Sequence, residues 1–119
     1  MDVKTKIQPP VNITVSDTDE VKLTVIVGNA QREGSIVRFD DAPKIIAKGD
    51  VDRLALGQGV NLKGKKLLVT TNVLDRNPAS LRIAITHQFE NGAPPQTRLS
   101  DKVDNPGDIF SWVTTYNFK

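Results

Sequence analysis

The sequence lacks cysteine altogether and is poor in the residues that most often carry chemistry. Its 119 residues include one histidine, one methionine, one tryptophan, one tyrosine and four phenylalanines. The absence of thiols excludes disulfide bonds, cysteine nucleophiles and the usual cysteine-rich zinc sites. We therefore expect a fold that depends on its hydrophobic core alone and that needs no cofactor.

Long apolar runs and a strong net charge are also missing. No run approaches the roughly 18 residues of a transmembrane helix, so we expect no membrane partner. Sixteen Lys and Arg residues against fourteen Asp and Glu residues give a formal net charge of +2. This is far from the basic field of a nucleic-acid-binding protein. The N-terminus shows no apolar segment of a secretory signal, which predicts a soluble, cytoplasmic protein and leaves a processed, exported form open.

What the chain does contain is a period-two alternation of apolar and polar residues, which is typical of strands with one buried face. The predicted strands lie at residues 11–15, 20–27, 35–39, 44–47, 67–74, 81–89, 96–99 and 109–118. A short turn segment separates the strand at 67–74 from the strand at 81–89, so we expect these two to form a hairpin. Residues 49–66 carry four glycines and are predicted to be largely irregular, with a brief helical turn or an edge strand at residues 51–56.

Many short strands and no long amphipathic helix predict an all-β protein. We favour an antiparallel β-sandwich of seven to eight strands, jelly-roll or immunoglobulin-like, with a small barrel as the alternative. Pro9 and Pro10 remove two successive backbone donors and fix two φ angles. The domain prediction is therefore an extended N-terminal arm at residues 1–10 and a single β-sandwich domain at residues 11–119.

One segment resembles a phosphate-binding loop in its spacing. Gly59, Gly64 and Lys65 match the pattern G-x-x-x-x-G-K, but Lys66 stands where a magnesium-binding Ser or Thr is needed. The segment also runs into a predicted strand, so the helix N-terminus that would face a phosphate is missing. We prefer a glycine turn in which Lys63, Lys65 and Lys66 are solvated or rest on an acidic neighbouring surface, and we count these lysines as candidate interaction residues.

His87 lies near the end of the apolar side of the strand predicted at residues 81–89. We expect a histidine that is satisfied within the core or at its rim. Catalysis through His87 needs a serine and an aspartate nearby in space, and no serine stands in a nucleophile elbow. The prediction is therefore a protein without enzyme activity, and a small hydrolase using His87 is kept as the second alternative.

Carboxylates cluster at predicted strand ends, at residues 17–20, 40–41, 50–52 and 101–108. None of these clusters has the ligand spacing of a calcium loop, and aspartate is common in turns because it tolerates left-handed backbone and bonds its own chain. We predict no metal site, with calcium dependence left open.

The aromatic residues gather near the C-terminus. Those expected in the core are Phe89, Phe110, Trp112, Tyr116 and Phe118. A two-layer fold must bury one face of each strand, and the rest of the chain offers mainly Val, Ile and Leu for this purpose. The alternative is that part of this set is exposed, and Tyr116 or Phe118 is then the residue favoured to emerge at the rim, since a terminal strand can project beyond its neighbours. They are therefore further candidate interaction residues.

These observations favour a non-enzymatic structural or interaction protein. Val3, Thr5 and Ile7 alternate along the arm, which can add as a strand to the sheet edge of a neighbouring subunit. We expect a protomer or adaptor that assembles with itself as a homo-oligomer, or with partner proteins, through edge strands, arm and loops. The alternative is a ligand-binding module of the carbohydrate-binding type, in which Trp112 and Tyr116 stack on a saccharide.

Overall fold

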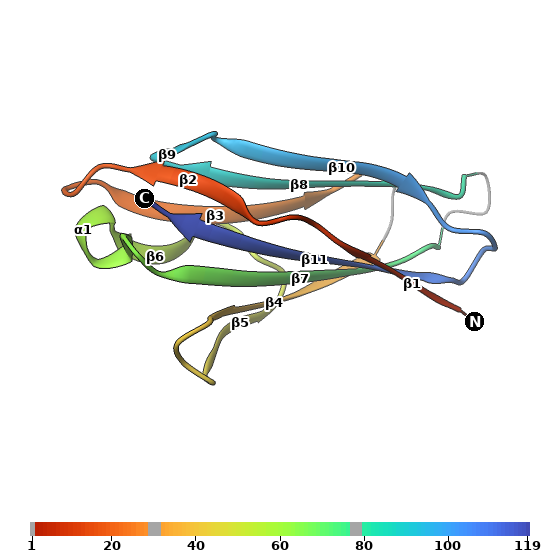
Figure 1. Ribbon diagram of the computed structural model, residues 1–119. Coiled ribbons are helices and arrows are strands. Elements are labelled where there is room, and N and C mark those ends of the chain that lie inside the picture. Colours follow the sequence, from red (N-terminus) through yellow and green to blue (C-terminus); the bar gives the residue numbers. More distant parts are fainter. Residues whose placement is uncertain (1, 29–31, 77–79) are drawn as a thin grey trace.

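The computed structural model describes residues 2–28, 32–76 and 80–119, and strands dominate it (Figure 1). The only helix in these ranges is the single turn α1 (Gly59–Leu62). The strands are β1 (Val3–Ile7), β2 (Val11–Val15), β3 (Glu20–Val27), β4 (Arg32–Phe39), β5 (Ile45–Gly49), β6 (Leu54–Gln58), β7 (Lys66–Leu74), β8 (Arg82–Glu90), β9 (Gly92–Ala93), β10 (Gln96–Lys102) and β11 (Ile109–Phe118).

The strands form two sheets that pack against each other. Sheet 1 has the order β5-β4-β7-β11-β2-β9, with β1 also paired to β11, and sheet 2 has the order β10-β8-β3-β6. Neither sheet closes on itself within the described residues. The predicted all-β sandwich is therefore confirmed, and the barrel alternative is wrong.

Most strand pairs are antiparallel, but β1 and β2 both run parallel to β11 along the same edge. Figure 1 shows them following β11 one after the other, in red and orange beside blue. Ile7 is paired with Val113 and Val11 with Tyr116, so the offset between paired residue numbers falls from 106 to 105. One residue must bulge between the two strands. Pro9 and Pro10 lie in this gap, where their missing N–H groups interrupt no ladder.

The core lies between the sheets and follows the predicted alternation. β7 and β11 are central in sheet 1, and every second side chain of each is buried. The buried hydrophobic residues on the inner faces come from both sheets and include Ile13, Val21, Leu23, Val37, Leu67, Val69, Ile83, Ile85, Phe110 and Trp112. Burying these residues removes from water the apolar surface that stabilises the fold, at roughly 25 cal/mol per Å².

The predicted hairpin between residues 67–74 and 81–89 is wrong. β7 pairs with β4 and β11 in sheet 1, whereas β8 pairs with β3 and β10 in sheet 2. The two strands therefore lie in different layers of the sandwich, and packed sheets are about 10 Å apart. Alternation fixes which face of a strand is buried but carries no information on which strand is its neighbour. Part of the predicted turn, Asn77 and Pro78, lies outside the described residues.

The segment at residues 49–66 is more regular than predicted. It contains α1, the last residue of β5, and β6, an edge strand of sheet 2 that overlaps the edge strand offered at residues 51–56. α1 is held against the turn between β2 and β3, because Gly59 N donates to Asp19 O at 2.9 Å and Val60 N donates to Asp17 O at 3.0 Å. These bonds are made with a turn about 40 residues earlier in the chain, so local sequence could not reveal them.

Candidate interaction surface

The predicted arm residues Val3, Thr5 and Ile7 belong to β1, which pairs with β11 of the same chain. The register joins Val3 to Ile109 and Ile7 to Val113. All five residues of β1 are exposed, and Val3 and Ile7 keep 59% and 75% of their surface in water. Within the described residues no strand pairs with the other edge of β1. The strand is thus held almost entirely by its backbone.

Two side-chain contacts add to the ladder. Lys4 Nζ lies 3.1 Å from Asp101 Oδ1 and donates to the carbonyl of Lys102 at 3.1 Å, which ties β1 to β10 of the other sheet. At the start of the strand, Asp2 N donates to Asp108 Oδ1 at 3.1 Å. The Lys4 contact is exposed to solvent, and such ion pairs contribute about 0 to 1 kcal/mol. These contacts position β1 without burying any of its side chains.

The three lysines of the phosphate-loop-like segment are placed at one end of the sandwich. Lys63 Nζ lies 2.6 Å from Asp17 Oδ1, and Lys65 Nζ lies 3.9 Å from Asp41 Oδ2 and 5.3 Å from the ring centroid of Phe39. Lys66 is exposed and begins β7. Two of the lysines thus rest on acidic partners, and no helix follows them to bind a phosphate.

The prediction that the five aromatic residues lie in the core is confirmed, and the alternative that Tyr116 or Phe118 emerges at the rim as an interaction residue is wrong. Tyr116 is fully buried and Phe118 is 1% exposed. β11 is a central strand whose aromatic face is covered by sheet 2. The ring of Phe89 meets Tyr116 edge-on at 4.7 Å and Phe118 edge-on at 6.1 Å. These two residues are therefore part of the core and not of an interaction surface.

The stacking platform of the carbohydrate-binding alternative is also absent from the surface. Trp112 and Tyr116 both have 0% exposure, so neither ring offers a face to a saccharide. Both rings lie on the face of β11 that packs against sheet 2, where Trp112 stacks on His87 and Tyr116 meets Phe89.

His87 is at the centre of a buried polar network that joins the two sheets. Its Nδ1 atom lies 2.8 Å from the Tyr116 hydroxyl, and its Nε2 atom lies 3.0 Å from Thr71 Oγ1. Thr71 Oγ1 in turn lies 3.1 Å from Ser35 Oγ. The imidazole also stacks on Trp112, with ring centroids 4.4 Å apart and planes inclined by 27°. Both ring nitrogens have a partner, so the prediction of a satisfied core histidine is confirmed.

Burial determines the charge of this network. Desolvation lowers the pKa of His87 to about 3, because the charged imidazolium loses its hydration. Burial also raises the pKa of the Tyr116 hydroxyl. Both groups are neutral at pH 7, and His87 has no exposed surface. The hydrolase alternative lacks a route by which a substrate could reach this histidine in the described fold.

The carboxylate clusters do not converge on a cation site. Among the described residues no group of three or more His, Asp or Glu side chains is arranged to hold a metal ion. Asp108 instead stabilises a turn, where Asn105 N donates to its Oδ2 atom at 3.0 Å. This is the turn chemistry expected of aspartate.

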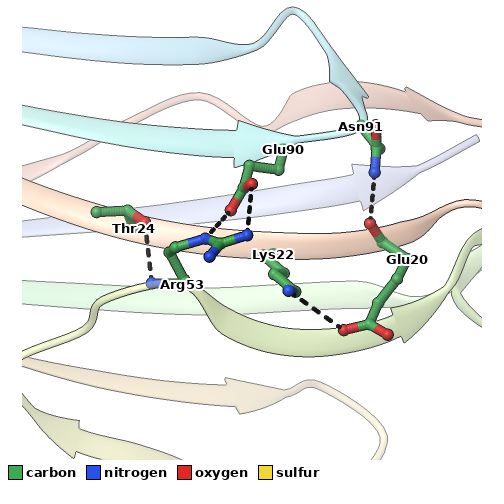
Figure 2. Close-up of polar contacts among 6 residues, drawn as sticks. All are labelled: Glu20, Lys22, Thr24, Arg53, Glu90 and Asn91. Atoms are coloured by element: carbon green, nitrogen blue, oxygen red, sulfur yellow. Dashed lines mark hydrogen bonds and ion pairs between the residues drawn. The ribbon is translucent and has the colours of Figure 1, made fainter.

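Sequence reasoning gave no role to a group of polar residues on the outer face of sheet 2, drawn in Figure 2. Arg53, between β5 and β6, forms a two-pronged contact with Glu90 at the end of β8: Nε lies 2.9 Å from Oε2, and Nη2 lies 3.1 Å from Oε1. The two residues are 37 positions apart. The pairing depends on how β6 and β8 lie on either side of β3, for which the sequence holds no local signal.

No helix in the described ranges is long and apolar enough to cross a bilayer. We compared the chain with protein-family models, with curated proteins and with solved structures, and no match was found.

Proposed function

We propose that the protein is a non-enzymatic β-sandwich protomer that assembles with a second copy of itself by exchanging β1. The observation that carries the proposal is the way β1 is bound. Its five residues pair with Ile109–Val113 through the backbone, yet all five side chains remain exposed. Leaving the sheet therefore exposes little additional apolar surface, and the opening free energy is low compared with that of a core strand.

A vacated edge of β11 is a specific receptor for an extended segment. Without β1, the N–H and C=O groups along Ile109–Val113 have no partner on that side, and unpaired edges are templates for another strand. The β1 strand of a second copy meets the same atoms as the chain's own β1 does. Because the ladder is identical in both arrangements, only the linker at residues 8–10 has to change its path.

The charges of β1 also fit exchange between copies. Lys4 pairs with Asp101 on β10, so a β1 strand arriving from another copy finds a carboxylate at the same register position. The two prolines of the linker hold it extended, which keeps a released β1 away from collapse onto its own domain. These features favour reciprocal exchange into a closed dimer.

Paired cysteines test the exchange directly, since the chain has no native cysteine. Thr5 and Ser111 are register partners on β1 and β11, and adjacent strands bring such pairs within disulfide reach. Thr5→Cys combined with Ser111→Cys, oxidised at high protein concentration, is expected to give a covalent dimer on a denaturing gel without reductant. The single variants Thr5→Cys and Ser111→Cys are the controls for random surface oxidation.

The competing outcome is equally clear. If the double variant yields only an internally cross-linked monomer at every concentration, β1 stays with its own chain and the proposal fails. A sizing comparison gives a second reading: the full chain is expected to form a dimer, and a chain starting at Val11 is expected to be a monomer. An unchanged oligomeric state in the shortened chain would contradict exchange through β1.

A further inference from the structure

The outer face of sheet 2 carries a cleft of about 450 Å³, on the opposite side of the sandwich from the outer face of sheet 1. Its polar lining residues are Thr24, Asp52, Arg53, Gln88, Glu90 and Gln96. The volume lies within the range of small-molecule sites, about 300 to 1,000 Å³. The lining brings together β3, β8, β10 and the segment before β6, so it exists only in the folded chain.

The floor of the cleft is a row of uncharged polar side chains. Gln96 on β10 is the register partner of Gln88 on β8, and Gln88 is the register partner of Thr24 on β3. No side-chain hydrogen bond of either glutamine is found within residues 2–28, 32–76 and 80–119. Each amide offers two donors and one acceptor oxygen. The row therefore presents alternating donors and acceptors to whatever enters the cleft.

One wall of the cleft is fixed by contacts that hold backbone in a costly conformation. Arg53 has φ of 50° and Asn91 has φ of 64°, and in the described part of the chain these are the only residues other than glycine with positive φ. Arg53 N donates to Thr24 Oγ1 at 3.0 Å, and Asn91 Nδ2 donates to Glu20 O at 2.8 Å, as Figure 2 shows. Left-handed backbone of this kind costs on the order of 1 to 3 kcal/mol and persists where surrounding contacts enforce it. Arg53 is itself one member of the pair with Glu90, and Asn91 directly follows Glu90 in the chain.

The charges of the cleft disfavour an anionic ligand. The Arg53 guanidinium is already engaged by both oxygens of Glu90, and its hydrogen bonds hold the pKa of that carboxyl below its ordinary value. Asp52 adds a second carboxylate on the same wall. A phosphate or a carboxylate would meet these two negative groups, while the Arg53 guanidinium is paired with Glu90 and the nearby Lys22 ammonium lies 3.9 Å from Glu20 Oε1. A neutral ligand meets no such repulsion.

From this arrangement we infer that the cleft on sheet 2 is a binding site for a neutral, hydroxyl-rich ligand, a saccharide unit. A sugar hydroxyl both donates and accepts hydrogen bonds, which matches the amide row of Gln88 and Gln96. The ring hydroxyls further along can donate to Asp52 and accept from the N–H groups of Arg53 that Glu90 leaves free. The site uses hydrogen bonds in place of aromatic stacking, since the aromatic rings on β11 are inside the core.

The test is a titration of the full, isotope-labelled chain followed by two-dimensional amide NMR. The probes are glucose, galactose, mannose, maltose, cellobiose and lactose, with inorganic phosphate as the anionic comparison. We expect at least one sugar to shift the side-chain amide signals of Gln88 and Gln96 and the backbone signals beside them. In the Gln88→Ala, Gln96→Ala double variant, the dissociation constant measured from the backbone shifts is expected to rise at least about tenfold. This corresponds to about 1.4 kcal/mol of binding free energy.

The control variant is Gln58→Ala, an exposed glutamine at the end of β6 that does not line the cleft. Binding is expected to survive this change. The inference is overturned if no sugar of the panel shifts the cleft signals, if the shifts persist in the double variant, or if phosphate produces them in place of sugars. The cleft shares no residue with β1. A negative result for sugar binding therefore does not affect the strand-exchange proposal, and a negative result for strand exchange does not affect the sugar-binding proposal.

Discussion

The Nδ1 atom of His87 on β8 lies 2.8 Å from the hydroxyl oxygen of Tyr116 on β11, and this hydrogen bond crosses the core from sheet 2 to sheet 1. The network continues from His87 to Thr71 and Ser35 on the other side of the imidazole. Buried polar groups of this kind are tolerated because each finds a partner, and an unmade bond there is costly. The network is therefore expected to respond sharply to acid and to the loss of any hydroxyl.

Acid is expected to destabilise the fold through His87. The unfolded imidazole titrates near pH 6.5, whereas burial lowers its folded pKa to about 3. Between these values the unfolded chain binds a proton that the folded chain does not. The free energy of unfolding therefore falls as the pH drops below about 6.5, by up to about 1.4 kcal/mol per pH unit.

Urea unfolding between about pH 7 and pH 5 measures this slope. The variant His87→Gln is expected to show a flatter dependence on pH than the wild-type chain, even if it is less stable throughout. Parallel slopes for the two proteins would show that His87 is not the group responsible.

Removing the Thr71 hydroxyl is expected to weaken the core. Thr71→Val keeps the shape of the side chain but leaves His87 Nε2 and Ser35 Oγ without this partner. The expected loss is about 1 to 3 kcal/mol of unfolding free energy. Thr70→Val is the matched control, since the neighbouring threonine on β7 is only partly buried and points to the opposite face. Its expected change is within about 0.5 kcal/mol, and equal effects of the two variants would contradict the network.

Two glycines are expected to differ in their tolerance of alanine. A Cβ atom added at Gly59 would collide with the backbone carbonyl of Ser16, which cannot move without disturbing the turn between β2 and β3. Gly59→Ala is therefore expected to lower the free energy of unfolding by about 2 kcal/mol or more. At Gly34 an added Cβ meets nothing within 4 Å, so Gly34→Ala is expected to be neutral or slightly stabilising. Thermal unfolding of both variants separates the two cases.

The lysine segment is expected to contribute little to stability. In the ion pair of Lys63 with Asp17 the side chains are 43% and 61% exposed. Such pairs contribute about 0 to 1 kcal/mol and weaken in salt. A double-mutant cycle with Lys63→Ala and Asp17→Ala is expected to give a coupling energy below about 1 kcal/mol that falls further as salt is raised. A larger coupling that is independent of salt would show that the pair is shielded from solvent.

The sequence predicted where the strands lie but not which strands are neighbours in a sheet. The alternation at residues 109–118 correctly placed Phe110 and Trp112 in the core, because side chains of an extended strand point to opposite faces in turn. The same alternation could not show that β7 and β8 belong to different sheets. It also could not show that β11 is central, and this is why the emergence of Tyr116 or Phe118 at the rim was left as an alternative.

The candidate sites were predictable to different degrees. Val3 and Ile7 could be singled out because they alternate beside two prolines, and a proline pair is a local feature. The cleft on sheet 2 escaped notice because Gln88, Gln96 and Arg53 are ordinary surface residues until strand order sets them side by side.

The sequence by itself determined that this protein is built from strands, that it has a single hydrophobic core and that it is stabilised without disulfide bonds. These properties follow from side-chain size, polarity and the period of two, all of which act over a few neighbouring residues. Only the tertiary structure decided that β1 lies along β11, that His87 is sealed inside the core and that the cleft on sheet 2 exists. Each of these depends on contacts between segments far apart in the chain. Such contacts stabilise the protein only once both sheets have formed.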